Sequence, residues 1–166
     1  KLPYVLIGKA CQYANQTIYI DNDYLLAGDE ATEYLYQLGH RKIAYLGVDN
    51  SLVFSADRRN GYQLALTRHG IVPKPEYCVE LPSITAGEDT PVHALLRSAS
   101  RPTAIVVSDD ILALTLERIC TETGLSIPAD LSILSFNNSL FARLTSPQLT
   151  SIDINSCQLG MEAAAQ

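Results

Sequence analysis

Two adjacent carboxylates, Asp109 and Asp110, follow a short run of β-branched residues, and an apolar pattern of helical period begins directly after them. This order predicts a buried strand over residues 103–107 that leads through a minimal turn into a helix over residues 110–124. In an open α/β sheet such a turn lies at the carboxyl edge of the strands, where ligands bind. The two carboxylates therefore either cap the helix or belong to a site.

Other polar side chains follow neighbouring predicted strands. Arg58 lies beyond the strand at residues 43–47, and Asn137 and Asn138 directly follow the strand at residues 131–136. If the strands are parallel, these groups share one edge of the sheet with the two carboxylates. A guanidinium with carboxylate and amide groups suits a polyhydroxylated ligand, because each hydroxyl both donates and accepts hydrogen bonds. Three aromatic residues near this edge could cover the apolar face of a sugar ring: Phe54, Phe136 and Phe141.

The same residues also have structural explanations, which spacing alone favours. Asp109 can cap the helix, Arg58 can form a surface ion pair, and Asn137 can be a turn residue. Residue types and spacing thus predict a polar sheet edge and leave its role open.

The elements that must position these side chains are strands and helices in alternation. Such alternation predicts an α/β fold with a doubly wound parallel sheet. The strands are expected at residues 3–8, 17–20, 43–47, 77–81, 103–107, 131–136 and 149–154, and the helices at 25–38, 57–70, 89–99, 110–124 and from 156 onward.

Composition narrows the function classes. The chain has 166 residues, 47% of them hydrophobic, and a net charge of −6. This fits one globular domain or slightly more, and it argues against a DNA-binding surface within these residues, since such surfaces show a basic excess. No apolar run approaches a membrane span and no leader precedes the first strand, so a soluble cytoplasmic protein is expected. Because the chain enters a strand without an initiator Met, we expect a fragment of a longer protein.

Motifs for catalysis and metal binding are missing from the sequence. It contains no GxGxxG, GxxxxGK[ST], GxSxG or HExxH pattern, so no cofactor, metal or catalytic step is predicted. An enzyme using Asp109 and Asp110 as acid and base would also need a nucleophile or cofactor motif. The cysteines are widely spaced without a CxxC pair and are expected to be free thiols: Cys11, Cys78, Cys120 and Cys157.

Four motifs lie in order along nearly the whole chain: LGHRKIAYLG at residues 38–47, SADRRNGY at 55–62, RPTAIVVSDDILAL at 101–114 and LSIPADLSILSFNN at 125–138. Each of them resembles an element of the LacI/GalR family of bacterial repressors. Residues 144–152 resemble a strand of the same family that has the motif PxLTTI. The version SFNNS followed by LTSIDI looks most like the maltose-operon repressor branch.

This resemblance implies a periplasmic-binding-protein-like fold with two Rossmann-like three-layer lobes, of which the chain holds mostly one. Residues 1–20 would end the first lobe, residues 21–148 would form the carboxyl-terminal effector-binding lobe, and residues 149–166 would cross back. The implied function is a sugar-responsive repressor, sensing maltose or a related saccharide, that acts as a homodimer. Operator DNA would be bound by an upstream helix-turn-helix absent from this sequence. The main alternative is a transport-type periplasmic sugar-binding protein of the same fold.

The resemblance also assigns effector contacts. The family's effector-binding arginine falls on Arg58, and its Asn-Asp pair falls on Asp109 and Asp110, which favours Asp109 as the ligand residue and Asp110 as structural. The family's Asp after Gly-Phe falls on Asn137, next to Phe136. Its Asp in the first strand segment is Gly8 here, so the neighbouring Lys9 is the expected substitute.

Overall fold

The computed structural model describes residues 4–10, 14–48, 52–82 and 89–166 and divides the chain into two compact units. Tyr24–Asp153 form the larger unit, and Lys1–Asp23 with Ile154–Gln166 form the smaller one. Thr150–Ile152 pair with the preceding strand and stay in the larger unit. The assignment of residues 1–20, 21–148 and 149–166 to parts of two lobes remains a prediction.

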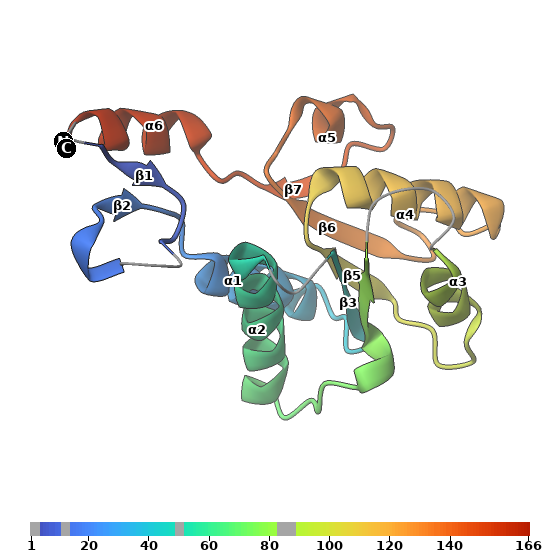
Figure 1. Ribbon diagram of the computed structural model, residues 1–166. Coiled ribbons are helices and arrows are strands. Elements are labelled where there is room, and N and C mark those ends of the chain that lie inside the picture. The colour runs from blue at the N-terminus through green and yellow to red at the C-terminus, as the bar shows by residue number, and fades with distance from the viewer. Residues whose placement is uncertain (1–3, 11–13, 49–51, 83–88) are drawn as a thin grey trace. The chain divides into compact units, whose positions relative to one another are not determined.

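A parallel sheet of five strands forms the centre of the larger unit, in the order β4-β3-β5-β6-β7 (Figure 1). The inner strands β3 and β5 are buried along their whole length, as expected for parallel strands covered on both faces. The predicted α/β fold with a parallel sheet is therefore confirmed. The strands are β3 (Ile43–Val48), β4 (Cys78–Leu81), β5 (Ala104–Val107), β6 (Ser132–Phe136) and β7 (Thr150–Ile152).

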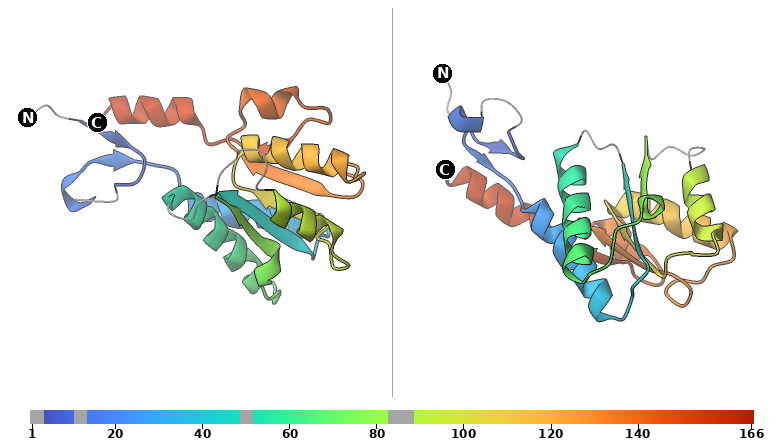
Figure 2. Two further views of the ribbon diagram at one scale, coloured as in Figure 1. Left: turned by 45° about the vertical axis from the view of Figure 1, so that its right-hand side comes forward. Right: turned by 90° about the horizontal axis from the view of Figure 1, so that it is seen from below.

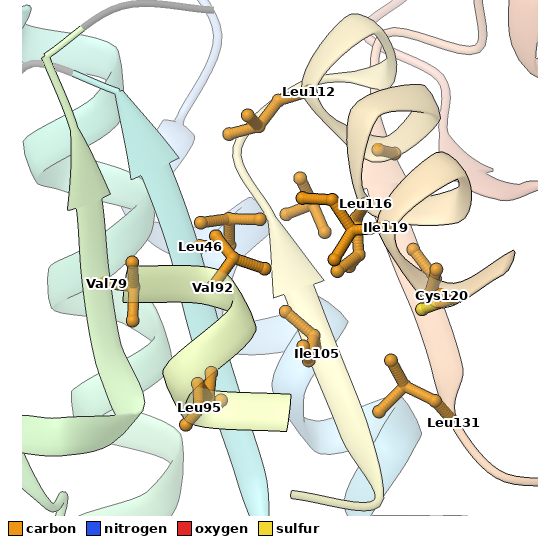
Figure 3. Close-up of a cluster of buried hydrophobic side chains, with 14 of the residues drawn as sticks. Leu46, Val79, Val92, Leu95, Ile105, Leu112, Leu116, Ile119, Cys120 and Leu131 are labelled. Atoms are coloured by element: carbon orange, nitrogen blue, oxygen red, sulfur yellow. The ribbon is translucent and has the colours of Figure 1, made fainter. Parts of the chain in front are cut away.

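Helices cover both faces of this sheet and make it the middle of three layers (Figure 2). Alternate strand residues point to opposite faces: Leu46 and Ile105 pack towards α3 and α4 (Figure 3), whereas Tyr45 and Val106 pack towards α1 and α2. The helices are α1 (Tyr24–Gln37), α2 (Val53–Arg68), α3 (Thr90–Arg97), α4 (Asp110–Glu122) and α5 (Leu140–Leu144), with a 3-10 turn, η2 (Pro75–Tyr77), before β4.

Helix α2 begins at Val53, whereas the sequence pattern predicted its start near residue 57. The earlier start carries Ser55 into the first turn, where its hydroxyl donates to the Val48 carbonyl (2.7 Å). This bond ties the start of α2 to the end of β3, so the helix that carries Arg58 starts at the carboxyl edge of the sheet.

Helices α1 and α2 cross at two glycines that allow backbone-to-backbone contact. A Cβ atom on Gly28 would lie 2.2 Å from the carbonyl oxygen of Arg58, and one on Gly61 would lie 2.1 Å from that of Leu25. No larger residue fits at either position without separating the helices. The crossing therefore fixes the backbone of Arg58 against α1.

The smaller unit contains a two-stranded parallel pair, β1 (Leu6–Ile7) with β2 (Tyr19–Ile20), a short 3-10 turn, η1 (Ala14–Gln16), and helix α6 (Ser156–Ala164). Helix α6 packs against both strands, which brings two ends of the sequence together within this unit. The apolar run at residues 3–8 predicted a strand, and β1 lies within it, with both of its residues exposed. The burial of a strand depends on the layers packed against it and cannot be read from its own hydrophobicity.

Two further expectations concern the cysteines, which were predicted to be free thiols, and membrane-spanning segments, of which none was predicted. Cys78, Cys120 and Cys157 are free thiols, as predicted, and Cys11 lies outside the described residues. In the part of the chain that the structure describes, no helix has the length and apolar character needed to cross a membrane.

Candidate functional site

Arg58, Asp109 and Asn137 come together at the carboxyl edge of the sheet, as their positions in the sequence predicted. Asp109 follows β5, Asn137 follows β6, and Arg58 reaches the edge from the second turn of α2. The guanidinium Nη1 donates to the Ser108 carbonyl (2.6 Å), and Nη2 lies 3.4 Å from Asn137 Oδ1. One arginine thus links the loops that follow the two neighbouring strands.

Arg58 does not form the surface ion pair that spacing alone favoured. Only 2% of the residue is exposed, and both of its recorded hydrogen bonds go to uncharged acceptors. The Nε–H, also buried, has no hydrogen-bond partner among the described residues. A buried cation with an unsatisfied donor indicates a place for a further acceptor, from a ligand or from water.

Aromatic rings surround the guanidinium. Its carbon lies 4.3 Å from the ring centre of Phe136, 4.8 Å from that of Tyr24 and 5.3 Å from that of Phe54. Phe136 is fully buried, so in this structure its ring packs against Arg58 and presents no open face. Phe141, grouped with these rings in the sequence analysis, is 54% exposed on α5. Sequence reasoning missed Tyr24, because nothing in its spacing indicates that the first turn of α1 approaches α2.

Burial and neighbouring charges act in opposite directions on Arg58. Burial lowers the pKa of its guanidinium below the usual value, and nearby groups that include Asp109 and Asp110 oppose this change. An arginine keeps its proton at any physiological pH, so the cluster retains a positive charge. This charge attracts electron-rich groups such as hydroxyl oxygens, carboxylates or phosphates.

Asp109 is the N-cap of α4, as spacing predicted. Its Oδ1 accepts a hydrogen bond from the Leu112 N–H (2.9 Å), and its Oδ2 accepts one from the Ser108 hydroxyl (3.3 Å). The residue is only partly buried, so its carboxylate has access to solvent and lone pairs left over. A ligand that binds this carboxylate would therefore contact the cap of α4 directly.

Asp110 is structural, in agreement with the expectation. It is 1% exposed and accepts hydrogen bonds from the Ser135 hydroxyl (2.5 Å), the Ser151 hydroxyl (2.7 Å) and the Ser139 N–H (2.7 Å). Its oxygens connect α4 to β6, β7 and the start of α5. With its lone pairs engaged in this way, Asp110 does not form an acid and base pair with Asp109. No local pattern near Asp110 indicates these partners, because they are distant in the sequence.

The loop after β6 has an unusual backbone conformation. Asn137 and Asn138 have φ angles of +99° and +42°, in the left-handed region that asparagine tolerates better than most residues. The Asn138 N–H donates to the Ser151 hydroxyl (2.9 Å), and its side-chain amide donates to Asp153 Oδ2 (3.0 Å). The predicted turn role of Asn137 is therefore compatible with its contact to Arg58.

Lys9 belongs to the smaller unit, in the segment that follows β1. Its assignment as an effector contact remains a prediction. Within residues 4–10, 14–48, 52–82 and 89–166, no group of three or more His, Cys, Asp and Glu side chains is arranged to hold a metal ion.

The chain is similar in sequence to a known family of binding domains and to a bacterial repressor. A family model described as a periplasmic binding protein-like domain matches residues 32–166. The chain is 32% identical over 147 residues to the HTH-type transcriptional repressor CytR of Escherichia coli strain K12, covering 89% of this chain and 42% of that protein. The chain thus spans less than half the length of this curated relative.

The fold is also similar to those of solved transcriptional regulators. The crystal structure of a transcriptional regulator LacI from Bacillus cereus subsp. cytotoxis NVH 391-98 superposes with a TM-score of 0.88 at 38% identity, over 98% of this chain and 58% of that one. A complex of the transcriptional regulator CelR with cellobiose superposes with a TM-score of 0.85 at 26% identity, over 99% of this chain and 50% of that one.

Proposed function

Because this chain belongs to the family of periplasmic binding protein-like domains, in the form carried by LacI/GalR regulators, we propose that it is the effector-binding core of a sugar-responsive transcriptional repressor. The observation that carries the proposal is the buried Arg58, which links the loops after β5 and β6 and whose Nε–H has no hydrogen-bond partner in the part of the chain that the structure describes. A ligand that binds Arg58 would act on the loops after β5 and β6 together, and an effector sensor needs a contact of this kind. The proposal includes no catalytic step.

A glucose disaccharide is the effector that we propose, with maltose as the first choice. Arg58 would donate to sugar oxygens, and the carboxylate of Asp109 would accept from sugar hydroxyls. The side-chain amide of Asn137 both donates and accepts, as a hydroxyl-rich ligand requires. The similar regulator CelR is described in complex with cellobiose, another glucose disaccharide. Phe136 supports Arg58 in the proposed site, and Lys9 is proposed as a further effector contact.

We further propose that the core acts as a homodimer in the cytoplasm and that operator DNA is bound by another domain of the full protein. An exposed apolar patch supports dimerisation: Ile111 on the first turn of α4 is 50% exposed, and three residues of α5 are 54–71% exposed. Helices α4 and α5 contact each other, so these side chains belong to neighbouring surfaces. The α5 members of this patch are Leu140, Phe141 and Leu144.

The proposed sensor and the proposed interface share helix α4. Asp109 caps the helix, and Ile111 lies on its first turn, only two residues further along the chain. A ligand that binds the carboxylate of Asp109 would therefore act on the same turn that contributes to the dimer patch. Coupling of this kind between two sites typically amounts to about 1–3 kcal/mol, enough to change operator affinity severalfold or more.

The Arg58→Met variant tests the effector site. Methionine keeps an apolar stem of similar length and removes the charge and the donors, so binding of maltose is expected to weaken by about 1.5–3 kcal/mol, roughly ten- to 150-fold. Isothermal titration calorimetry with maltose and cellobiose measures this change. Urea unfolding of the same variant separates lost binding from lost folding.

Arg59→Met is the matched control, since Arg59 is next in the sequence and pairs with Glu80 (2.9 Å) instead of entering the cluster. Its dissociation constant for the sugar is expected to equal that of the unsubstituted chain. Equal affinity in the folded Arg58→Met variant would remove Arg58 from the site. Failure of the unsubstituted chain to bind any glucose disaccharide would contradict the proposed effector.

The Leu144→Glu variant tests the proposed interface. A charge in the middle of an apolar interface should raise the dimer dissociation constant about thirtyfold or more, the effect of losing a contact worth about 2 kcal/mol. Sedimentation equilibrium measures the constant. Leu64→Glu serves as the control, because Leu64 is similarly apolar and 50% exposed but lies on α2, against the opposite face of the sheet. A dimer that survives Leu144→Glu, or a chain that is monomeric without it, would contradict the proposed interface.

A further inference from the structure

A cavity of about 190 Å³ lies at the amino ends of β6 and β7, the end of the sheet opposite to the Arg58 cluster. Apolar side chains from separate parts of the larger unit line it, among them Leu38 beyond α1, Ile127 before β6 and Leu149 before β7. The cavity is thus formed where three segments distant in sequence meet. It shares no residue with the effector site described above.

Glu117, on α4, contributes the one charge to this lining. Its carboxylate makes no hydrogen bond or ion pair with any described residue, although it is partly withdrawn from water and burial raises its pKa. The neighbouring cation, Arg118, is already engaged by Asp89 (2.7 Å) and Glu122 (2.5 Å). A partly buried carboxylate without a counter-charge, at the wall of a cavity lined by both apolar and polar side chains, favours a ligand that brings its own positive charge.

Size restricts the ligand further. A volume of about 150 Å³ is enough for benzene, so this cavity of about 190 Å³, which is partly open to solvent, has room for one ring with a short polar side chain. We propose that this cavity is a second small-molecule site, selective for a primary amine on a compact apolar body, with the ammonium on Glu117 and the apolar body against Leu38, Ile127 and Leu149. This inference does not depend on the proposed repressor function.

Phenethylamine is a probe that fits these requirements, and its binding can be followed by ¹H–¹⁵N correlation spectra of the isotope-labelled chain. We expect saturable shifts of the backbone amides of Ser132, Gln148 and Thr150, which line the cavity, and no shifts at Ser108 or Asn137. 2-Phenylethanol lacks the charge, and ethylamine lacks the ring, so both are expected to bind about tenfold more weakly than phenethylamine. Phenylacetate carries the wrong charge and is expected not to bind.

Glu117→Gln keeps the shape of the side chain and removes only its charge. We expect phenethylamine to bind this variant about tenfold more weakly, the effect of losing one charge-assisted hydrogen bond, while 2-phenylethanol binds it as before. Glu76→Gln is the matched control, because it removes the same charge from an exposed residue of η2 that does not line the cavity. Equal binding of phenethylamine to the Glu117→Gln variant, equal binding of the neutral probe, or shifts confined to other residues would each overturn the proposal.

Discussion

Substitution of Asp110 by alanine is expected to destabilise the larger unit by about 3–5 kcal/mol. The change removes the acceptor for the Ser135 hydroxyl, the Ser151 hydroxyl and the Ser139 N–H, all at a residue that is 1% exposed. Each hydrogen bond to a charged group contributes roughly 1.5–3 kcal/mol, and buried donors left without partners carry a desolvation cost. The losses are not additive because the hydroxyls can rotate towards other acceptors. Urea unfolding at neutral pH measures the difference.

Two further variants make this result specific. Asp110→Asn keeps one oxygen acceptor but turns an amide donor towards a donor group, so its stability should fall between those of the alanine variant and the unsubstituted chain. Asp130→Ala removes an exposed carboxylate that accepts from the Ser126 N–H (2.9 Å), and it should cost no more than about 1 kcal/mol. A loss below about 1 kcal/mol in Asp110→Ala would show that the buried network contributes little net stability.

Substitution of Gly28 by alanine is expected to cost about 2 kcal/mol or more, although alanine is the better helix former. The new methyl carbon would lie 2.2 Å from the carbonyl oxygen of Arg58, and the overlap involves backbone that no change of rotamer can relieve. Helices α1 and α2 must separate, and such overpacking costs typically about 1–3 kcal/mol or more, which exceeds the helix propensity gain of roughly 1 kcal/mol. Because the atom displaced belongs to Arg58, sugar affinity should fall as well.

Gly160→Ala is the control for this substitution. Gly160 is also helical, in α6, and an added Cβ there has nothing within 4 Å. This variant should be as stable as the unsubstituted chain or more stable by up to about 1 kcal/mol. Thermal unfolding of both variants measures their stability and separates the effect of helix packing from that of helix propensity. Titration calorimetry measures their affinity for the sugar. A Gly28→Ala protein of undiminished stability would mean that α1 and α2 can move apart freely.

The alternation of strands and helices was predictable because it depends on local patterns. The buried run at β5, the helical period of α4 and the turn chemistry after β6 each lie within a few residues, and the structure has elements at these places. Helix α2 was less well predicted: its first turn lacks a side-chain cap, and its start is set by the bond between Ser55 and Val48, which no local signal announces.

The site was predicted in part. The sequence placed Arg58, Asp109 and Asn137 near one edge, because the carboxyl ends of parallel strands share an edge whatever the details of packing. Two roles suggested by spacing agree with the structure, those of Asp109 as a cap and Asn137 as a turn residue. The prediction of a surface ion pair for Arg58 was wrong, because the burial of a side chain depends on the helices and strands that surround it.

The sequence by itself determined the order of the elements, the parallel sheet and the residue types at its carboxyl edge, since all of these follow from hydrophobic period and turn chemistry. Only the tertiary structure decided which carboxylate is free and which is engaged. Asp109 and Asp110 are adjacent and chemically identical, yet one caps α4 at a partly open surface while the other is buried among Ser135, Ser139 and Ser151. Those partners lie 25 to 41 residues away, and only packing of α4 against β6, β7 and α5 brings them within hydrogen-bonding distance.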